Sequence, residues 1–262
     1  MTCQAALAPI AELSESDVIN MLCDPTQLHV VFQPQVNLET GRIESAEALA
    51  RWRHPALGMV APSRFIPMVT AMELQGALFK RIARLTLAAA TELDRAGIVL
   101  PLAINACADT LSDADNLNFL FDEARRSRVD ASRLKIELTE DAPVKNMPAL
   151  KAALSRLQDW GCTISMDDFG AGQANLGMLI SLTINELKLD RKFAASISVS
   201  QVAQKSVRFA VELAKDMGWR VVAEGISTAA EFNAMYSLGC RYGQGFLLGR
   251  PMPLDGLSRC SR

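Results

Sequence analysis

Short apolar runs alternate with amphipathic helical stretches along most of this chain. At four junctions a glycine separates a helical stretch from the run that follows, and these glycines are Gly97, Gly161, Gly218 and Gly239. Glycine just past a helix adopts the left-handed conformation at little cost, so each junction indicates a helix end followed by a strand. This alternation predicts parallel strands covered by helices, the α/β class.

Eight of the runs fit strands, near residues 29–35, 42–51, 100–106, 134–140, 163–169, 186–190, 220–225 and 243–248. Eight such units predict a closed, TIM-like (β/α)8 barrel with its active site at the C-terminal strand ends. The first two runs differ, because the NLETG segment between them is too short for a crossover helix. They are expected to pair as a hairpin, which places one antiparallel strand at the start of the barrel.

The barrel is expected to occupy residues 28–255 as one domain, since barrels of this kind often reach about 250 residues. Residues 1–27 are expected to be an N-terminal extension with a leading helix from Ser14 to Leu22. The tail after Pro251 is expected to fray, with residues 256–262 flexible.

Composition excludes several classes of function. The formal net charge of −2 gives no basic field for nucleic acid or a membrane surface. No apolar run approaches the ~20 residues of a membrane span, and the first residues lack the basic region of a signal peptide. The 6 cysteines are scattered without a CxxC pair, which indicates reduced thiols in a cytoplasmic protein.

Polar residues stand at the ends of seven apolar runs. They are Glu47, Asn105, Glu137, the pair Asp167 and Asp168, Lys188, Glu224 and Gln244. A carboxylate at the end of a buried strand is costly unless a positive charge meets it. Since barrel strand ends converge, these side chains are expected to form one polar site. Oxygen donors without His or Cys favour Mg²⁺ or Mn²⁺ over Zn²⁺.

The acids also have plainer interpretations when each is taken singly. Asp167 and Asp168 fit either a metal-bridging pair or a solvated loop that caps a helix. Glu47 and Glu137 each lie in a strand of alternating apolar and polar residues. Each fits either a metal ligand or a buried salt bridge, for which Arg51 would serve as a partner.

The remaining polar ends have similar alternatives. Lys188 fits a cation that orients water or steadies a phosphate, or an ion pair with Glu186 or Asp190. Glu224 fits a base for water, or a carboxylate facing the next helix. Gln244 lies between two glycines, which indicates close backbone approach to a ligand.

An ordered set of motifs runs from about Phe32 to Pro253: FQPQ, EALARW, HPALGMVAPSRFIP, AIN, IELTE, MDDFGAG, LKLD, AEG and QGFLLGRPMP. This set strongly resembles the EAL-domain family of bacterial cyclic di-GMP phosphodiesterases, named for the tripeptide found here as Glu47-Ala48-Leu49. The resemblance implies a TIM-like barrel with one antiparallel strand. It also implies cleavage of cyclic di-GMP to linear 5′-pGpG with two Mg²⁺ or Mn²⁺ ions.

The resemblance further implies a role for each site residue. Positions that match metal ligands are Glu47, Asn105, Glu137, Asp167, Asp168 and Glu224. Positions that match catalytic groups are Lys188, which orients water, with Glu224 and Asp168. Positions that match substrate contacts are Gln33, Leu49, Arg51 and Gln244. Glu140 matches the glutamate that anchors the loop after Asp168.

Three segments depart from the usual family pattern. Ser227 stands where EGVE has an acid, Gln173 and Ala174 replace an aromatic residue and a serine, and Ala106-Cys107 replace Leu-Ser. These changes spare the metal ligands, so the enzyme is favoured. The alternative is a weak or inactive EAL domain that senses cyclic di-GMP or binds a protein partner.

The family also implies a homodimer. The expected contact is the loop Gly170–Leu176 with the helix after it, where apolar residues crowd a short segment. Any regulatory domain or protein partner is left unidentified.

Overall fold

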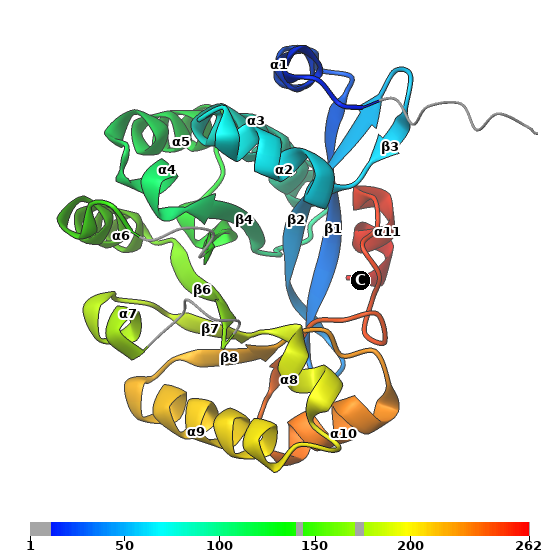
Figure 1. The fold of residues 1–262 in the computed structure, drawn as a ribbon, viewed down its shortest axis with the longest axis vertical. Helices are drawn as coiled ribbons and strands as arrows, with labels where there is room; N and C mark the ends of the chain where they lie inside the picture. Colours follow the sequence, from blue (N-terminus) through cyan, green and yellow to red (C-terminus); the bar gives the residue numbers. More distant parts are fainter. Residues whose placement is uncertain (1–11, 140–143, 171–175, 262) are drawn as a thin grey trace, which may run out of the picture.

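The computed structural model describes residues 12–139, 144–170 and 176–261 (Figure 1). Its strands are β1 (Leu28–Asn37), β2 (Ile43–His54), β3 (Gly58–Val60), β4 (Leu102–Cys107), β5 (Leu134–Thr139), β6 (Thr163–Phe169), β7 (Glu186–Leu189), β8 (Arg220–Ala223) and β9 (Tyr242–Gly243). The order is β1-β9-β8-β7-β6-β5-β4-β2-β3, and a β1–β2 pairing closes eight strands into a ring. The predicted barrel is confirmed.

The barrel begins with the expected hairpin. Strand β1 runs antiparallel to both of its neighbours, β2 and β9, whereas the pairings from β2 through β4 to β9 are parallel. Two details differ from the expectation. The short strand β3 extends β2 as a second hairpin, and β9 ends at Gly243 rather than near residue 248. Beyond Gly243 the chain forms a turn, in which Leu248 N and Gly249 N both donate to Gly245 O, at 3.1 and 2.9 Å.

Helices surround the ring on its outside (Figure 1). They are α1 (Glu15–Cys23), α2 (Pro62–Ala71), α3 (Gln75–Arg95), α4 (Ala108–Ser112), α5 (Ala114–Ser127), α6 (Met147–Trp160), α7 (Leu176–Ser181), α8 (Arg191–Ser196), α9 (Gln201–Met217), α10 (Ala229–Ser237) and α11 (Leu254–Cys260), with a 3₁₀ turn at Ala131–Arg133. The four predicted helix-ending glycines, Gly97, Gly161, Gly218 and Gly239, all have positive φ. Within the described ranges, no helix is both long and apolar enough to cross a membrane.

The two ends of the chain pack against the barrel. The leading helix is α1, capped by Ser14, with Val18 and Met21 fully buried. The C-terminal segment differs from the expected flexible tail, since residues through Cys260 form α11 beside β1 (Figure 1). Backbone hydrogen bonds between Phe32 and Met252 hold the segment before α11 against β1, and Leu257 within α11 is fully buried.

Alternation along the strands divides the barrel into an apolar outside and a polar inside. On β5, Leu134, Ile136 and Leu138 belong to the apolar core, while Lys135 and Glu137 between them are buried polar residues. Because successive strand residues point to opposite faces, Lys135 and Glu137 enter the barrel interior. The interior therefore carries the chemistry, and the helices bury the hydrophobic surface.

Candidate active site

Polar side chains converge at the C-terminal ends of the barrel strands. We name the following set the mouth cluster: Glu47, Asn105, Glu137, Asp167, Asp168, Lys188, Glu224 and Gln244. They come from strands β2, β4, β5, β6 and β7 and from the residues just after β8 and β9. The structure thus brings together every strand-end residue that the sequence singled out.

Lys188 lies at the centre of the mouth cluster and is fully buried. Its Nζ meets four carboxylates: Glu224 Oε1 at 2.7 Å, Glu137 Oε2 at 2.8 Å, Asp167 Oδ1 at 3.0 Å and Glu47 Oε2 at 3.6 Å. The alternative pairing of Lys188 with Glu186 is wrong, since Glu186 binds Lys135 at 2.7 Å. Asp190 instead caps α8 by accepting from Lys192 N.

Two amides hold the carboxylate of Glu47. Asn105 Nδ2 donates to Oε1 and Gln244 Nε2 donates to Oε2, each at 2.7 Å. Arg51, expected as a possible partner of Glu47, donates instead to the carbonyl oxygen of Ala50 at 2.8 Å. Glu47 is therefore oriented by neutral donors and by the charge of Lys188.

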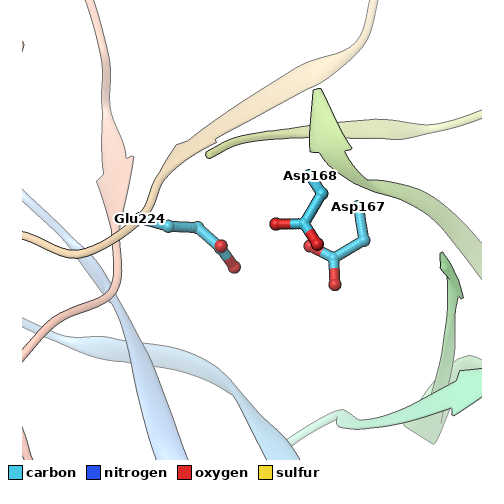
Figure 2. Close-up of side chains that lie close together, drawn as sticks. All are labelled: Asp167, Asp168 and Glu224. Atoms are coloured by element: carbon cyan, nitrogen blue, oxygen red, sulfur yellow. The ribbon is translucent and has the colours of Figure 1, made fainter. Parts of the chain in front are cut away.

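The adjacent acids Asp167 and Asp168 face the same side of the barrel mouth (Figure 2). Strand alternation alone would point them apart. The pairing of β6 with β7 shifts between Met166 and Phe169, and Asp168 has the left-handed φ of 54°. This local bend lets ligand oxygens of both aspartates and of Glu224 lie within 4.8 Å of one another. Left-handed backbone in a residue other than glycine is typical of functional sites.

The mouth cluster contains five acids and one lysine, and this excess of negative charge shifts the pKa of several groups. Burial, followed by the charge of Asp167, raises the pKa of Asp168 to about 6. Burial, reinforced by Asp167 and opposed by Lys188, raises the pKa of Glu224 to about 8. Burial also raises the pKa of Glu137 well above its usual value.

Two further groups in the cluster, Lys188 and Glu47, keep their charge. Burial would lower the pKa of Lys188, but the surrounding carboxylates, led by Asp167, raise it well above its usual value. Burial would raise the pKa of Glu47, but Lys188 and the two amides lower it. The cluster therefore holds protons at neutral pH, or it requires further cations.

The residues present fit hard divalent cations. Among the described residues, Asp167 Oδ1 and Gln244 Oε1 are buried and accept no hydrogen bond, although Asp167 Oδ1 lies 3.0 Å from Lys188 Nζ. Buried acceptors of this kind are costly without a partner. Carboxylate and amide oxygens are the donors that Mg²⁺ and Mn²⁺ prefer.

The expected substrate contacts lie beside the cluster or further along β2. Gln33 Nε2 donates to Gly249 O at 3.2 Å, and Gln33 Oε1 accepts from Gln244 at 3.3 Å. Leu49 lines a cavity of about 270 Å³ next to Asn105. The expected anchor of the loop after Asp168, Glu140, and the loop residues Gln173 and Ala174 lie outside the described residues.

The glycines beside Gln244 pack closely against the chain itself, and the approach of a ligand to this backbone stays a prediction. A Cβ on Gly245 would lie 2.1 Å from Ile226 O, and one on Gly243 would lie 2.7 Å from Ile226 Cδ1. Both glycines therefore permit close packing against the chain itself. Their effect on the site is to bring Gln244 to Glu47.

Two family departures can be placed in the structure. Ser227 is exposed; its Oγ donates to Gly225 O at 2.9 Å and its backbone N donates to Glu231 at 2.6 Å. Cys107 ends β4 as the N-cap residue of α4, and its Sγ lies 3.1 Å from Thr110 Oγ1. Of the apolar residues expected at a dimer contact, Leu179 is buried in this chain's own core.

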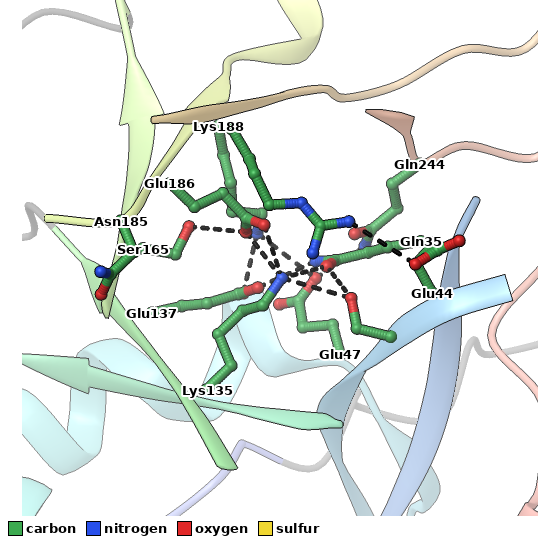
Figure 3. Close-up of polar contacts among 12 residues, drawn as sticks. Gln35, Glu44, Glu47, Lys135, Glu137, Ser165, Asn185, Glu186, Lys188 and Gln244 are labelled. Atoms are coloured by element: carbon green, nitrogen blue, oxygen red, sulfur yellow. Dashed lines mark hydrogen bonds and ion pairs between the residues drawn. The ribbon is translucent and has the colours of Figure 1, made fainter. Parts of the chain in front are cut away.

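Sequence reasoning missed a second polar group below the mouth. We name the following set the inner layer: Gln35, Ser45, Lys135, Ser165 and Glu186, all buried. Lys135 Nζ donates to both oxygens of Glu186, at 2.7 and 2.8 Å (Figure 3). The signal was present in the sequence, because Ser45, Lys135, Ser165 and Glu186 each stand two residues before a mouth residue on the same strand face.

Comparison with known proteins identifies relatives that match most of this chain. The family model described as EAL domain matches residues 17–251. Cyclic di-GMP phosphodiesterase PA2567 of Pseudomonas aeruginosa is 37% identical over 224 residues, which cover 86% of this chain but 38% of that relative. The chain therefore spans less than two thirds of that protein's length.

Solved structures agree with the fold. The PaMucR phosphodiesterase in its c-di-GMP complex has a TM-score of 0.86 and 30% identity, covering 94% of this chain and 100% of that one. Klebsiella pneumoniae BlrP1 in a manganese/cy-diGMP complex has a TM-score of 0.76 and 28% identity, covering 87% of this chain and 56% of that one.

Proposed function

This chain belongs to the EAL-domain family, and on that premise we propose that it hydrolyses cyclic di-GMP to linear 5′-pGpG with two Mg²⁺ or Mn²⁺ ions. The observation that carries the proposal is the mouth cluster, in which ligand oxygens of Asp167, Asp168 and Glu224 lie within 4.8 Å of one another. Similarity to a named cyclic di-GMP phosphodiesterase and to structures with c-di-GMP and manganese supports the choice of substrate and metal.

We assign the ligand sets from the family resemblance, and the grouping of Asp167, Asp168 and Glu224 supports the second of them. Glu47, Asn105, Glu137 and Asp167 would hold one ion. Asp167, Asp168 and Glu224 would hold the second. When bound, two such ions lower the pKa of water and neutralise charge on the phosphate oxygens. The buried acceptor Asp167 Oδ1 would then gain a partner.

Side chains of this protein are proposed to accept the proton of the attacking water and to orient that water. Hydrolysis adds a water oxygen to one phosphorus and breaks the bond from that phosphorus to a 3′ oxygen, leaving a 5′-phosphate and a 3′-hydroxyl. Glu224 would be ionised once a cation has displaced its proton, and it is then the proposed acceptor of the proton that the water loses; the leaving 3′ oxygen would take up a proton from bulk water. Lys188, fixed 2.7 Å from Glu224 and 2.8 Å from Glu137, would orient that water and stabilise the growing negative charge.

Substrate recognition is assigned to residues that border the mouth. Gln33 and Gln244 adjoin Glu47, and Leu49 and Arg51 follow it along β2. Gln244 Oε1, buried and without a donor among the described residues, is available to a substrate N–H or O–H. Glu140 is retained as the proposed loop anchor.

Incubation of the purified protein with cyclic di-GMP and Mn²⁺, followed by anion-exchange chromatography, tests the proposal. We expect pGpG to accumulate, and we expect excess EDTA to stop it. Binding of cyclic di-GMP without any pGpG at saturating Mn²⁺ would instead identify a binding module. Full turnover in EDTA would exclude the metal-dependent mechanism.

We also propose a homodimer formed through α7 and the loop before it. With Leu179 buried in the chain's own core, the contact would depend on other residues of that segment. Light scattering of the purified protein gives its mass, and a monomer at the concentration of the assay would exclude this contact.

A further inference from the structure

The inner layer is joined to the mouth cluster through Gln35 (Figure 3). Gln35 Nε2 donates to Glu137 Oε1 at 2.9 Å, and Lys188 Nζ donates to Glu137 Oε2 at 2.8 Å. Glu137 is fully buried, so no water competes for either oxygen from the surface. Each oxygen of this carboxylate thus has its own donor.

The amide of Gln35 is held in one orientation. Its Oε1 accepts from Lys135 Nζ at 2.8 Å and from Ser45 Oγ at 2.5 Å. A lysine ammonium can only donate, so a flipped amide would set its NH₂ group against another donor. The presence of Lys135 therefore requires Gln35 to present its NH₂ group to Glu137.

Lys135 is itself fixed from the other side. Its Nζ donates to both oxygens of Glu186, and Ser165 Oγ donates to Glu186 Oε1 at 3.0 Å. The exposed fractions of Lys135 and Glu186 are 3% and 1%. The hydrogen bonds from Ser165 through Glu186, Lys135 and Gln35 to Glu137 therefore form one continuous buried network.

We propose that Gln35 and Lys135 are positioning residues that orient Glu137 for a divalent cation. Gln35 occupies Oε1 and thereby keeps Oε2 directed at Lys188 and the mouth, while Lys135 keeps the Gln35 amide from flipping. Groups that hold a metal ligand in place commonly change metal affinity by about 10- to 100-fold when they are removed. This inference rests on the proposed function only in requiring that the mouth cluster bind a cation.

Mn²⁺ binding to the metal-stripped protein, measured without substrate by electron paramagnetic resonance of free Mn²⁺, tests the inference. The first variant is Gln35→Met, which removes the donor to Glu137. The second is Lys135→Met combined with Glu186→Met, which removes both charges together and frees the Gln35 amide. The matched control is Ser165→Ala, which removes a hydrogen bond to Glu186 in the same layer and keeps the hydrogen bonds of Gln35 and Glu137.

We expect Gln35→Met to weaken Mn²⁺ binding by about tenfold or more, the double variant to weaken it less, and Ser165→Ala to leave it unchanged. Circular dichroism verifies that each variant is folded, and the double variant decides the question if Gln35→Met does not fold. Turnover of the folded variants should recover when Mn²⁺ is raised, which a loss of folded protein would not do.

The outcomes separate this inference from the proposed function. Wild-type affinity for Mn²⁺ in the folded Gln35→Met and double variants overturns the positioning role alone. Mn²⁺ binding by the wild type without hydrolysis of cyclic di-GMP overturns the proposed function alone. Failure of the wild type to bind Mn²⁺ overturns both.

Discussion

Two buried lysines enter the same barrel and differ in the charge around them. In the inner layer, Lys135 faces the single carboxylate of Glu186, and its remaining contacts are with neutral Gln35 and Ser45. In the mouth cluster, Lys188 faces four carboxylates within 3.6 Å. The positive charge of Lys135 is therefore balanced by one negative charge, whereas Lys188 is surrounded by more negative charges than it can balance.

The difference separates a structural use of buried charge from a functional one. A matched pair with its hydrogen bonds complete is satisfied without any ligand. A group of crowded carboxylates must take up protons or cations, because like charges in a poorly solvated site repel one another. The inner layer thus has no net charge, and the mouth cluster above it has an excess of negative charge that favours the binding of cations.

Lys135→Met should have the largest effect on stability. It leaves the carboxylate of Glu186 buried without a counter-charge, which we expect to lower the free energy of unfolding by about 3–5 kcal/mol. The Lys135→Met/Glu186→Met double variant should lose much less, because no unpaired charge remains. Urea unfolding followed by circular dichroism measures both, and equal losses in the two variants would contradict the matched-pair interpretation.

Asp167→Asn should show the opposite behaviour in the mouth cluster. We expect turnover of cyclic di-GMP to fall at least about 100-fold, a barrier increase of about 2.7 kcal/mol, because a proposed bridging ligand is lost. The metal-free protein should keep its stability, since one of several crowded negative charges is removed. If Asp167→Asn unfolds more easily but retains turnover per folded molecule, Asp167 has a structural role and the functional assignment of the mouth cluster is contradicted.

The barrel and the convergence of its strand ends could be predicted because both depend on local patterns. Glycine at helix ends, alternation on β5 and the short turn after β1 are each visible in a few adjacent residues. The tail differed from the expectation because the burial of Leu257 depends on a tertiary contact of α11 with β1.

The partners of the site residues could not be predicted from the sequence. The choice of Lys188 between Glu186 and the mouth carboxylates depends on how strands β2, β5, β6 and β7 are staggered around the ring. The common direction of Asp167 and Asp168 depends on a register shift and a left-handed residue, and alternation predicts neither. Pairs across the barrel require the closed structure.

The affinity of the mouth cluster for Mn²⁺ should rise with pH. Burial first, with Asp167 and Glu47 adding to it, raises the pKa of Glu224 to about 8, so at pH 7 this group holds a proton that a cation must displace. We expect affinity to increase by up to about tenfold per pH unit from pH 6 toward 8 and then to level off. Calorimetry in two buffers of different ionisation enthalpy measures the released proton.

The same group gives the opposite trend for the metal-free fold. Its folded pKa of about 8 exceeds the usual 4.5, so its contribution to stability is present below pH 4.5 and is lost as pH rises through 8. Glu224→Gln should reduce both slopes, and the raised pKa values of Asp168 and Glu137 account for the slope that remains. A pH-independent affinity for Mn²⁺ in the wild type would show that no proton leaves this site.

Ser227→Glu should have the smallest effect. It adds an acid at the exposed rim, three residues beyond Glu224. Since charges at exposed positions are screened, we expect Mn²⁺ affinity and turnover at limiting Mn²⁺ to rise by no more than about threefold, with the fold unchanged. The control is Ser227→Gln, which adds similar bulk without charge. A rise in both variants would indicate an effect of side-chain size, and a fall in Ser227→Glu alone would mean that the rim favours a neutral residue despite the family pattern.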